Sequence, residues 1–365
     1  MIINLRDGDS SREYVNSHWR SAIMLFDIRD IVREARKVVS SHAGTIPGEY
    51  HRVLKPGRER NIKTGVTAYG CADAACILYT LDELPPDTAV REAWIEAIRR
   101  FQNPKTGLFK DGSHHEIHTT AFALAALDLF DARAKYPLKA LHPLRGREKM
   151  EAFLDNLQWQ QEPWLDSHQG AGIYSALVLN REVSREWEDW YFAWLWENED
   201  PETGFWRKGK ILPASDPESP VPLFHYLGGS FHYLFNIVFA KRKQRYPERA
   251  VDTCLEIWES HHQPLYGEPF CRGVSYAEID WVFYLNRSVR QCGYRFEESR
   301  KAMEAAAAEY IDYLKQIDYN SDPAFNDLHK LFGMICALSE FQLALPGQFI
   351  TERPLRQVLD RRPYI

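Results

Sequence analysis

Four histidines and one aspartate recur at similar intervals along the sequence. They are His118, His168, His225, Asp280 and His329, and the intervals between them are 50, 57, 55 and 49 residues. Imidazole titrates near neutral pH, and a carboxyl group can take up or release the same proton, so such a set can carry out general acid–base catalysis. We therefore take these five residues as candidate catalytic residues.

Other polar and aromatic residues lie near these five in the sequence. Those that can bind or orient a hydroxylated substrate are Tyr69, Asp166, Tyr226, Tyr276, Glu278, Trp281 and Asp327. Two other interpretations of the histidines stay open. Each can simply cap or hydrogen-bond a neighbouring loop, or two or three of them with an aspartate can bind a divalent metal. We predict no other cofactor.

Two kinds of helical segment alternate along the chain and must position these residues. Six segments beginning near residues 65, 117, 166, 223, 275 and 325 are small or apolar almost all round, which is typical of helices buried on every side. The segments that alternate with them are apolar on one side only: 19–41, 88–102, 147–158, 185–196, 248–260 and 297–317. A short helix at 355–360 closes the chain.

A period of about fifty residues is typical of arrays of helix pairs. We predict an all-α fold, an (α/α)6 toroid with the six apolar helices as its inner ring. The whole chain, 1–365, forms one domain, in which residues 1–60 lead into the ring, 61–345 form the repeats and 346–365 close it. Because the candidate catalytic residues start their helices, they should meet at one mouth of the ring.

Two turns of the chain share a pattern, FQNPKTGLF at 101–109 and NEDPETGFW at 198–206. The matching positions are Pro104 and Pro201, Thr106 and Thr203, Gly107 and Gly204, and Phe109 and Trp206. Glycine suits a turn that needs a positive φ, and the aromatic side chain can fold back as a plug.

This pattern resembles the glycine–aromatic turn of the squalene–hopene cyclase and protein prenyltransferase β-subunit repeats, across about residues 60–345. The resemblance implies the (α/α)6 toroid. The acidic motifs of those families, Asp-x-Asp-Asp and Asp-Asp-x-x-Asp, are absent. Asp252 and Cys254 resemble part of the prenyltransferase zinc segment, but they lie on an outer helix, away from the mouth where His329 lies. Zinc ligands must all lie about 2 Å from one point, so we predict that these residues bind no zinc.

Composition excludes several classes of function. The net charge is −6, with a pI near 6.1 and no basic block, which argues against a nucleic-acid partner. No apolar run is long enough to span a membrane, and the first residues have no signal-peptide core. The six cysteines form no C-x-x-C pair, as in reduced proteins. We predict a soluble cytoplasmic protein, whose oligomeric state the sequence does not fix.

Architecturally, the predicted toroid is also similar to polysaccharide lyases, several glycosidase families and sugar 2-epimerases, which use His, Tyr and carboxylates. We therefore predict an enzyme acting on a sugar or a uronic-acid-containing glycan, by hydrolysis, β-elimination or epimerisation. Its partner would be a small molecule or an oligosaccharide. The alternatives are a terpenoid or prenyl-type cyclase or transferase, favoured by an aromatic cavity without charge, and a non-catalytic binding module, favoured by a blocked mouth.

Overall fold

The computed structural model describes residues 24–56, 64–112, 114–212, 221–260 and 270–364. In these residues the secondary structure is helical apart from isolated bridges and one pair of two-residue strands. Strand β1 (Phe26–Asp27) pairs in parallel with β2 (Phe349–Ile350). The predicted all-α class is therefore confirmed. The amphipathic helix predicted at 19–41 begins only at Arg29, because β1 occupies the residues before it, and residues 19–23 lie outside the described part.

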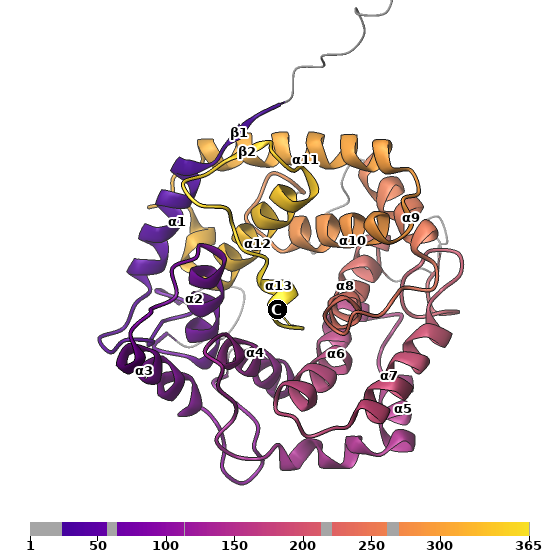
Figure 1. The fold of residues 1–365 in the computed structure, drawn as a ribbon, viewed down its shortest axis with the longest axis horizontal. Helices are drawn as coiled ribbons and strands as arrows, with labels where there is room; N and C mark the ends of the chain where they lie inside the picture. The colour runs from indigo at the N-terminus through magenta and orange to yellow at the C-terminus, as the bar shows by residue number, and fades with distance from the viewer. Residues whose placement is uncertain (1–23, 57–63, 113, 213–220, 261–269, 365) are drawn as a thin grey trace, which may run out of the picture.

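Six buried helices form the inner layer of the molecule. They are α2 (Ala68–Thr80), α4 (Glu116–Leu129), α6 (Pro163–Leu179), α8 (Leu223–Phe239), α10 (Ala277–Cys292) and α12 (Leu328–Ala344). Each packs against the next, and α12 also packs against α2, so the layer closes on itself (Figure 1). The observed starts lie within three residues of the predicted ones. Helices apolar on all sides can be accommodated here because each is covered by neighbours all round.

A second set of helices lies outside this layer (Figure 1). They are α1 (Arg29–Ser41), α3 (Thr88–Arg99), α5 (Arg147–Asp155), α7 (Arg185–Asn198), α9 (Pro247–Glu259) and α11 (Phe296–Gln316). Short helical turns complete the chain: η1 (Lys139–Arg145), η2 (Pro323–Asn326) and α13 (Val358–Arg361). The one-sided apolar pattern of the outer helices matches this position, since one face contacts the inner layer and the other faces solvent. None of the described helices combines the length and apolarity needed to cross a membrane.

The two turns that share a sequence pattern also share a conformation. Gly107 and Gly204 have φ values of +80° and +69°, as predicted. A Cβ at Gly107 would lie 2.0 Å from the Pro137 carbonyl oxygen, so no other residue fits. The aromatic residues that follow, Phe109 and Trp206, are almost fully buried. Each turn thus fixes an outer helix to the connection that follows it.

Equivalent polar side chains, Gln102 and Glu199, hold the two turns in place. The Oε1 atom of Gln102 accepts hydrogen bonds from the backbone N–H groups of Lys135 and Tyr136, both at 2.9 Å. The carboxylate of Glu199 accepts the same pair of bonds from Arg245 and Tyr246, at 2.7 and 2.9 Å. The equivalent pair of backbone N–H groups is therefore held by an amide in one repeat, Gln102, and by a carboxylate in the other, Glu199.

The buried carboxyl group of Glu199 stabilises the fold less at neutral pH than at acidic pH. Burial raises the pKa of Glu199 to about 7, from 4.5 in an exposed glutamate. Between pH 4.5 and pH 7 the Glu199 side chain is deprotonated in the unfolded chain but still protonated in the folded one. The free energy of unfolding therefore falls as the pH rises through this range. We expect Glu199→Gln to raise the free energy of unfolding by about 1–3 kcal/mol at pH 8 and to change it little at pH 4. Urea unfolding at both pH values measures this, and an equal effect at both would contradict it.

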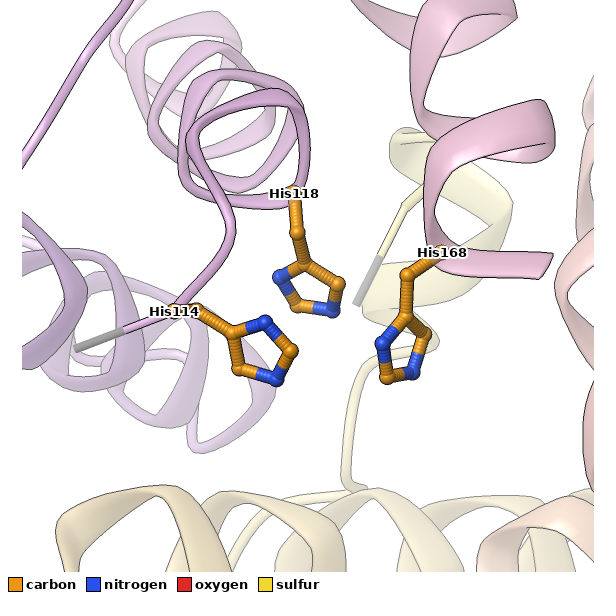
Figure 2. Close-up of side chains that lie close together, drawn as sticks. All are labelled: His114, His118 and His168. Atoms are coloured by element: carbon orange, nitrogen blue, oxygen red, sulfur yellow. The ribbon is translucent and has the colours of Figure 1, made fainter. Parts of the chain in front are cut away.

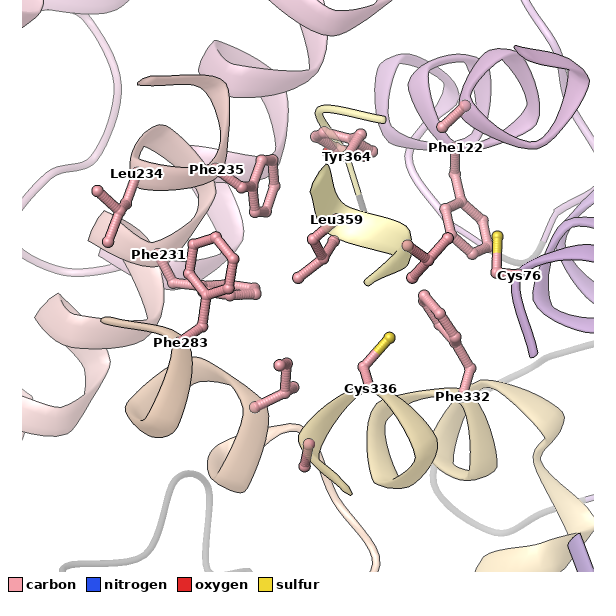
Figure 3. Close-up of a cluster of buried hydrophobic side chains, with 14 of the residues drawn as sticks. Cys76, Phe122, Phe231, Leu234, Phe235, Phe283, Phe332, Cys336, Leu359 and Tyr364 are labelled. Carbon is pink, nitrogen blue, oxygen red and sulfur yellow. The ribbon is translucent and has the colours of Figure 1, made fainter. Parts of the chain in front are cut away.

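The C-terminal segment, 355–364, enters the middle of the inner layer. Figure 3 shows Leu359 and Tyr364 among aromatic side chains from the surrounding helices. The Pro363 carbonyl oxygen accepts hydrogen bonds from Ser175 Oγ at 2.8 Å and from Asn236 Nδ2 at 2.9 Å. Tyr364 is fully buried, and its hydroxyl donates to the His168 carbonyl oxygen at 2.5 Å. The segment therefore fills the interior from the end where the inner helices finish.

The place where α12 meets α2 joins the two ends of the repeat array. Arg52, which is almost fully buried, forms a two-pronged ion pair with Asp327, at 3.0 and 3.2 Å. The N–H of Leu328 donates to the Arg52 carbonyl oxygen at 2.8 Å, and Val53 bridges to Asp327. Together with the pairing of β1 and β2, these contacts close the inner layer.

Candidate functional site

A small pocket lies at the end of the inner layer where its helices begin. The space inside it that can hold a water-sized molecule is about 20 Å³, and the empty volume reaches about 380 Å³ only when the open solvent at its mouth is included. It is lined by His114, His118, Trp164, His168, Phe231, His232, Tyr276, Asp280 and His329. Four of the five predicted catalytic residues are among them, namely His118, His168, Asp280 and His329. They meet because each lies within the first six residues of its inner helix, at the end of the inner layer where these helices begin.

Three imidazoles form the most compact part of this pocket, which we call the histidine trio: His114, His118 and His168. Figure 2 shows their rings turned toward one another. The rings of His114 and His118 stack at 4.0 Å between centroids, and that of His168 meets His118 edge-on at 4.3 Å. One nitrogen from each lies within 4.8 Å of the other two. His114 precedes α4 and lines the pocket, while His115 caps that helix by accepting the Ile117 N–H.

The central member of the trio, His118, is uncharged near neutral pH. Burial holds the pKa of His118 well below its usual range, and the neighbouring imidazoles lower it further. A neutral imidazole has one nitrogen lone pair available to accept a proton or to bind a metal ion.

Tyr69 fixes the orientation of His118. Its hydroxyl lies 2.8 Å from His118 Nδ1, within hydrogen-bond distance, and its ring is fully buried. The Arg52 guanidinium lies 4.6 Å from the centre of the Tyr69 ring, in a cation–π contact. Asp327 in turn holds Arg52 and caps α12 by accepting the His329 N–H at 3.1 Å. The predicted substrate-binding residues Tyr69 and Asp327 therefore support the pocket from behind and are not among its lining residues.

His329 pairs with a carboxyl group that our sequence analysis did not identify. Its Nδ1 lies 2.7 Å from Oδ1 of Asp73, which is fully buried on α2. Burial raises the pKa of Asp73 well above its usual range, while the positive charges of Arg52 and Arg362 oppose this shift. The pair thus keeps a proton between Nδ1 and Oδ1, and Nε2 is the atom at which His329 can exchange a proton. The Tyr276 ring packs 4.8 Å from the His329 ring.

Asp280 is the second carboxyl group of the site. It is almost fully buried, and among the described residues its Oδ2 has no hydrogen-bond partner. Burial raises its pKa well above the usual range, and the nearby charge of Glu278 raises it further. Gly228 makes room for it, since a Cβ there would lie 3.0 Å from Asp280 Oδ2 and 2.8 Å from Trp164 Cδ1. A buried carboxyl oxygen left without a hydrogen bond is costly unless it is used, which makes Asp280 a candidate proton donor.

His225, which the sequence analysis predicted as catalytic, is not among the residues that line this pocket. It is the third residue of α8, as His118 is the third residue of α4, so an equivalent place at the start of an inner helix does not by itself bring a side chain to the pocket. The lining residues of α8 are Phe231 and His232, and His232 lies two turns further along the helix than His225. His232 Nδ1 lies 2.8 Å from Ser167 Oγ, and burial lowers its pKa to about 3.

Four predicted substrate-binding residues also lie away from the pocket. Asp166 accepts a hydrogen bond from the Gln158 N–H, and the Tyr226 hydroxyl donates to the Gln160 carbonyl oxygen. The Glu278 carboxylate accepts bonds from the Cys271 N–H and the Ser275 hydroxyl, which hold the segment before α10. The Trp281 indole donates to the Cys254 carbonyl oxygen on α9. Adjacent residues of a helix point about 100° apart, so Trp281 faces outward where Asp280 faces inward. Tyr276 is the one predicted substrate-binding residue that lines the pocket.

Asp252 and Cys254 lie on α9, an outer helix, as predicted. Asp252 forms an ion pair with Arg295 at 3.0 Å, and Cys254 is buried where α9 packs on α10. In the part of the chain that the structure describes, the potential metal ligands that come together are those of the histidine trio. That neither residue binds zinc stays a prediction.

Our sequence analysis missed four residues that line the pocket, His114, His232, Trp164 and Phe231, and also Asp73, the buried partner of His329. A signal for Asp73 was present, because it is the one charged residue in the otherwise small and apolar stretch 65–81. A charge buried on all sides must be paired or used. The same reasoning applies to His232, a second histidine on a helix that is apolar all round.

Comparisons with known proteins give no relative of this chain. No protein-family model, no curated protein and no solved structure matches it. The geometry of the pocket therefore carries the functional argument alone.

Proposed function

We propose that this protein is an enzyme that transfers protons to and from a small hydroxylated substrate in the pocket at the start of the inner helices. The observation that carries this proposal is the pairing of His329 with Asp73 at 2.7 Å, beside a pocket that contains Asp280, whose buried Oδ2 has no hydrogen-bond partner among the described residues. Two proton-exchanging groups on separate helices suit reactions in which one group removes a proton and another delivers one.

In this proposal His329 and Asp280 are the catalytic residues and Asp73 is a positioning residue. Asp73 holds the proton at Nδ1 and fixes the ring, so that Nε2 exchanges protons with the substrate. Asp280 keeps its proton near neutral pH and delivers it to a leaving oxygen or to a carbanion. Tyr276 lines the same space and can hydrogen-bond a substrate hydroxyl.

The substrate class we propose is a sugar or a uronic acid, with hydrolysis, β-elimination or epimerisation as the reaction. The polar lining supports this over a terpenoid or prenyl cyclase, which needs an apolar cavity. The buried pairing of His329 with Asp73 supports an enzyme over a non-catalytic binding module. We further propose that the double layer of helices is an (α/α)6 toroid related in fold to the squalene–hopene cyclase and prenyltransferase repeats, and that the protein is cytoplasmic.

Solvent-proton exchange tests the proposal without knowledge of the product. The full chain is incubated in D2O with a panel of aldoses, ketoses, uronic acids and uronate oligosaccharides, and NMR follows loss of carbon-bound protons, double-bond formation and new reducing ends. For the active substrate we expect His329→Gln and Asp280→Asn to lower turnover by about 10²–10⁴-fold. Asp73→Asn should lower turnover and shift its pH profile, since it changes the proton held at Nδ1.

The matched control is Gln169→Ala on α6, a partly exposed residue that is not among those lining the pocket. It should keep wild-type turnover. If no member of the panel reacts, or if His329→Gln and Asp280→Asn keep turnover within about threefold of wild type, the proposal is wrong.

A further inference from the structure

We infer that the histidine trio, His114, His118 and His168, binds one divalent transition-metal ion of the zinc and cobalt class. This metal site goes beyond the proton-transfer function proposed above, which uses His329, Asp73 and Asp280. The two proposals use different residues of one pocket and can be tested separately.

The geometry of the trio is close to that of a metal site. Ligand nitrogens lie about 2 Å from a bound zinc ion, which places them about 3–4 Å from one another. One nitrogen of each imidazole already lies within 4.8 Å of the other two. Side-chain rotations that unstack His114 from His118 and bring the nitrogens about 1 Å closer would complete the site, and the three rings lie side by side (Figure 2).

The chemistry of three adjacent imidazoles suits a transition-metal ion. The rings of the trio stack or meet edge-on with each other at 4.0, 4.3 and 5.1 Å between centroids, and all three line the same pocket. Neutral imidazole is a good ligand for Zn²⁺, Co²⁺, Ni²⁺, Cu²⁺ and Fe²⁺. Three protein ligands leave a coordination position for water or substrate, as in catalytic zinc sites.

A supporting contact is also present. Metal-binding histidines usually use their second ring nitrogen to hydrogen-bond an acceptor that fixes the ring. The Tyr69 hydroxyl lies 2.8 Å from His118 Nδ1 and can accept that proton, which leaves Nε2 for the metal. Arg52 over the Tyr69 ring and Asp327 behind Arg52 hold this hydroxyl in place. His118 is therefore the ligand whose orientation is fixed in advance.

Metal titration of the full chain tests the inference without any substrate. Protein freed of metal by a chelator, which is then removed, is titrated with Zn²⁺ by calorimetry and with Co²⁺ by visible absorption. We expect one equivalent of each metal to bind, with a dissociation constant for Zn²⁺ of about 1 µM or lower. The Co²⁺ spectrum should have the intensity of a four- or five-coordinate site. His118→Ala and His168→Ala should weaken binding at least about 100-fold, and Tyr69→Phe about tenfold.

Two further variants keep the test decisive. His114→Ala changes a partly exposed residue ahead of α4, so it should fold normally and still lose most of its metal affinity. His225→Ala removes a buried histidine on α8 that is not among those lining the pocket, and it should bind metal as the wild type does. If the wild-type chain binds less than about half an equivalent, or if His114→Ala and His225→Ala bind equally well, the site does not exist. A protein that binds metal but converts no member of the substrate panel would retain this inference and lose the proposed function.

Discussion

Replacing Tyr364 by alanine should lower the free energy of unfolding by about 3–5 kcal/mol, the usual cost of deleting a fully buried aromatic side chain. The side chain is wholly inaccessible and lies between the inner helices, where its ring contacts that of His118 at 5.0 Å between centroids. No neighbour can fill the resulting space without moving a helix, because the inner layer is closed. Urea unfolding followed by circular dichroism measures the loss.

Tyr364→Phe is the matched control for this prediction. It keeps the ring and removes only the hydroxyl, which donates to the His168 carbonyl oxygen at 2.5 Å, so it should cost about 0.5–1.5 kcal/mol. Equal costs for the two variants would mean that the hydrogen bond, and not the packing, holds the segment. A cost below about 1 kcal/mol for Tyr364→Ala would mean that the C-terminal segment contributes little to the interior.

Asp327→Ala should be comparably destabilising, by about 3–5 kcal/mol, because it removes the carboxylate that neutralises Arg52. The Arg52 side chain is 1% exposed, and the two-pronged ion pair joins the first and last repeats. The substitution also removes the cap of α12, which accounts for about 1 kcal/mol of this loss. Thermal and urea unfolding both report the effect.

Two variants separate the charge from the cap. Asp327→Asn keeps a good helix cap and loses the charge, so it should cost about 1 kcal/mol less than Asp327→Ala. The double variant Arg52→Met with Asp327→Asn removes both charges and should be more stable than Asp327→Asn alone, since no uncompensated charge then stays buried. Simple addition of the two single effects would contradict this account of the ion pair.

The sequence was sufficient to predict the helices of this fold because the residue composition of each helix indicates whether it lies in the inner or the outer layer. A stretch such as α4, with small or apolar residues on every side, can be stable only where neighbours surround it. The shared turns also carried information, since Gly107 and Gly204 have the positive φ that their sequence pattern indicated. The fold was thus encoded locally, one repeat at a time.

The site was less predictable because it depends on depth and on contacts between distant segments. His225 and His118 are each the third residue of an inner helix, and of the two only His118 is among the residues that line the pocket. The pairing of Asp73 with His329 joins residues 256 positions apart and follows from contact between the first and last inner helices. Hydrophobic periodicity says which helices are buried, but it does not give the turn at which each helix meets the pocket.

Closure of the inner layer by α12 against α2 also bears on how the protein folds. Contacts this far apart in sequence carry a large loop-closure cost and form slowly, and a chain emerging from the ribosome presents α2 long before α12 exists. During synthesis the apolar faces of α2 and α10 thus have no partner on one side, which makes the incomplete chain a substrate for chaperones. Since Asp73 and His329 meet only across this last junction, we expect the pocket to assemble at the end of folding, and truncated chains to lack it altogether.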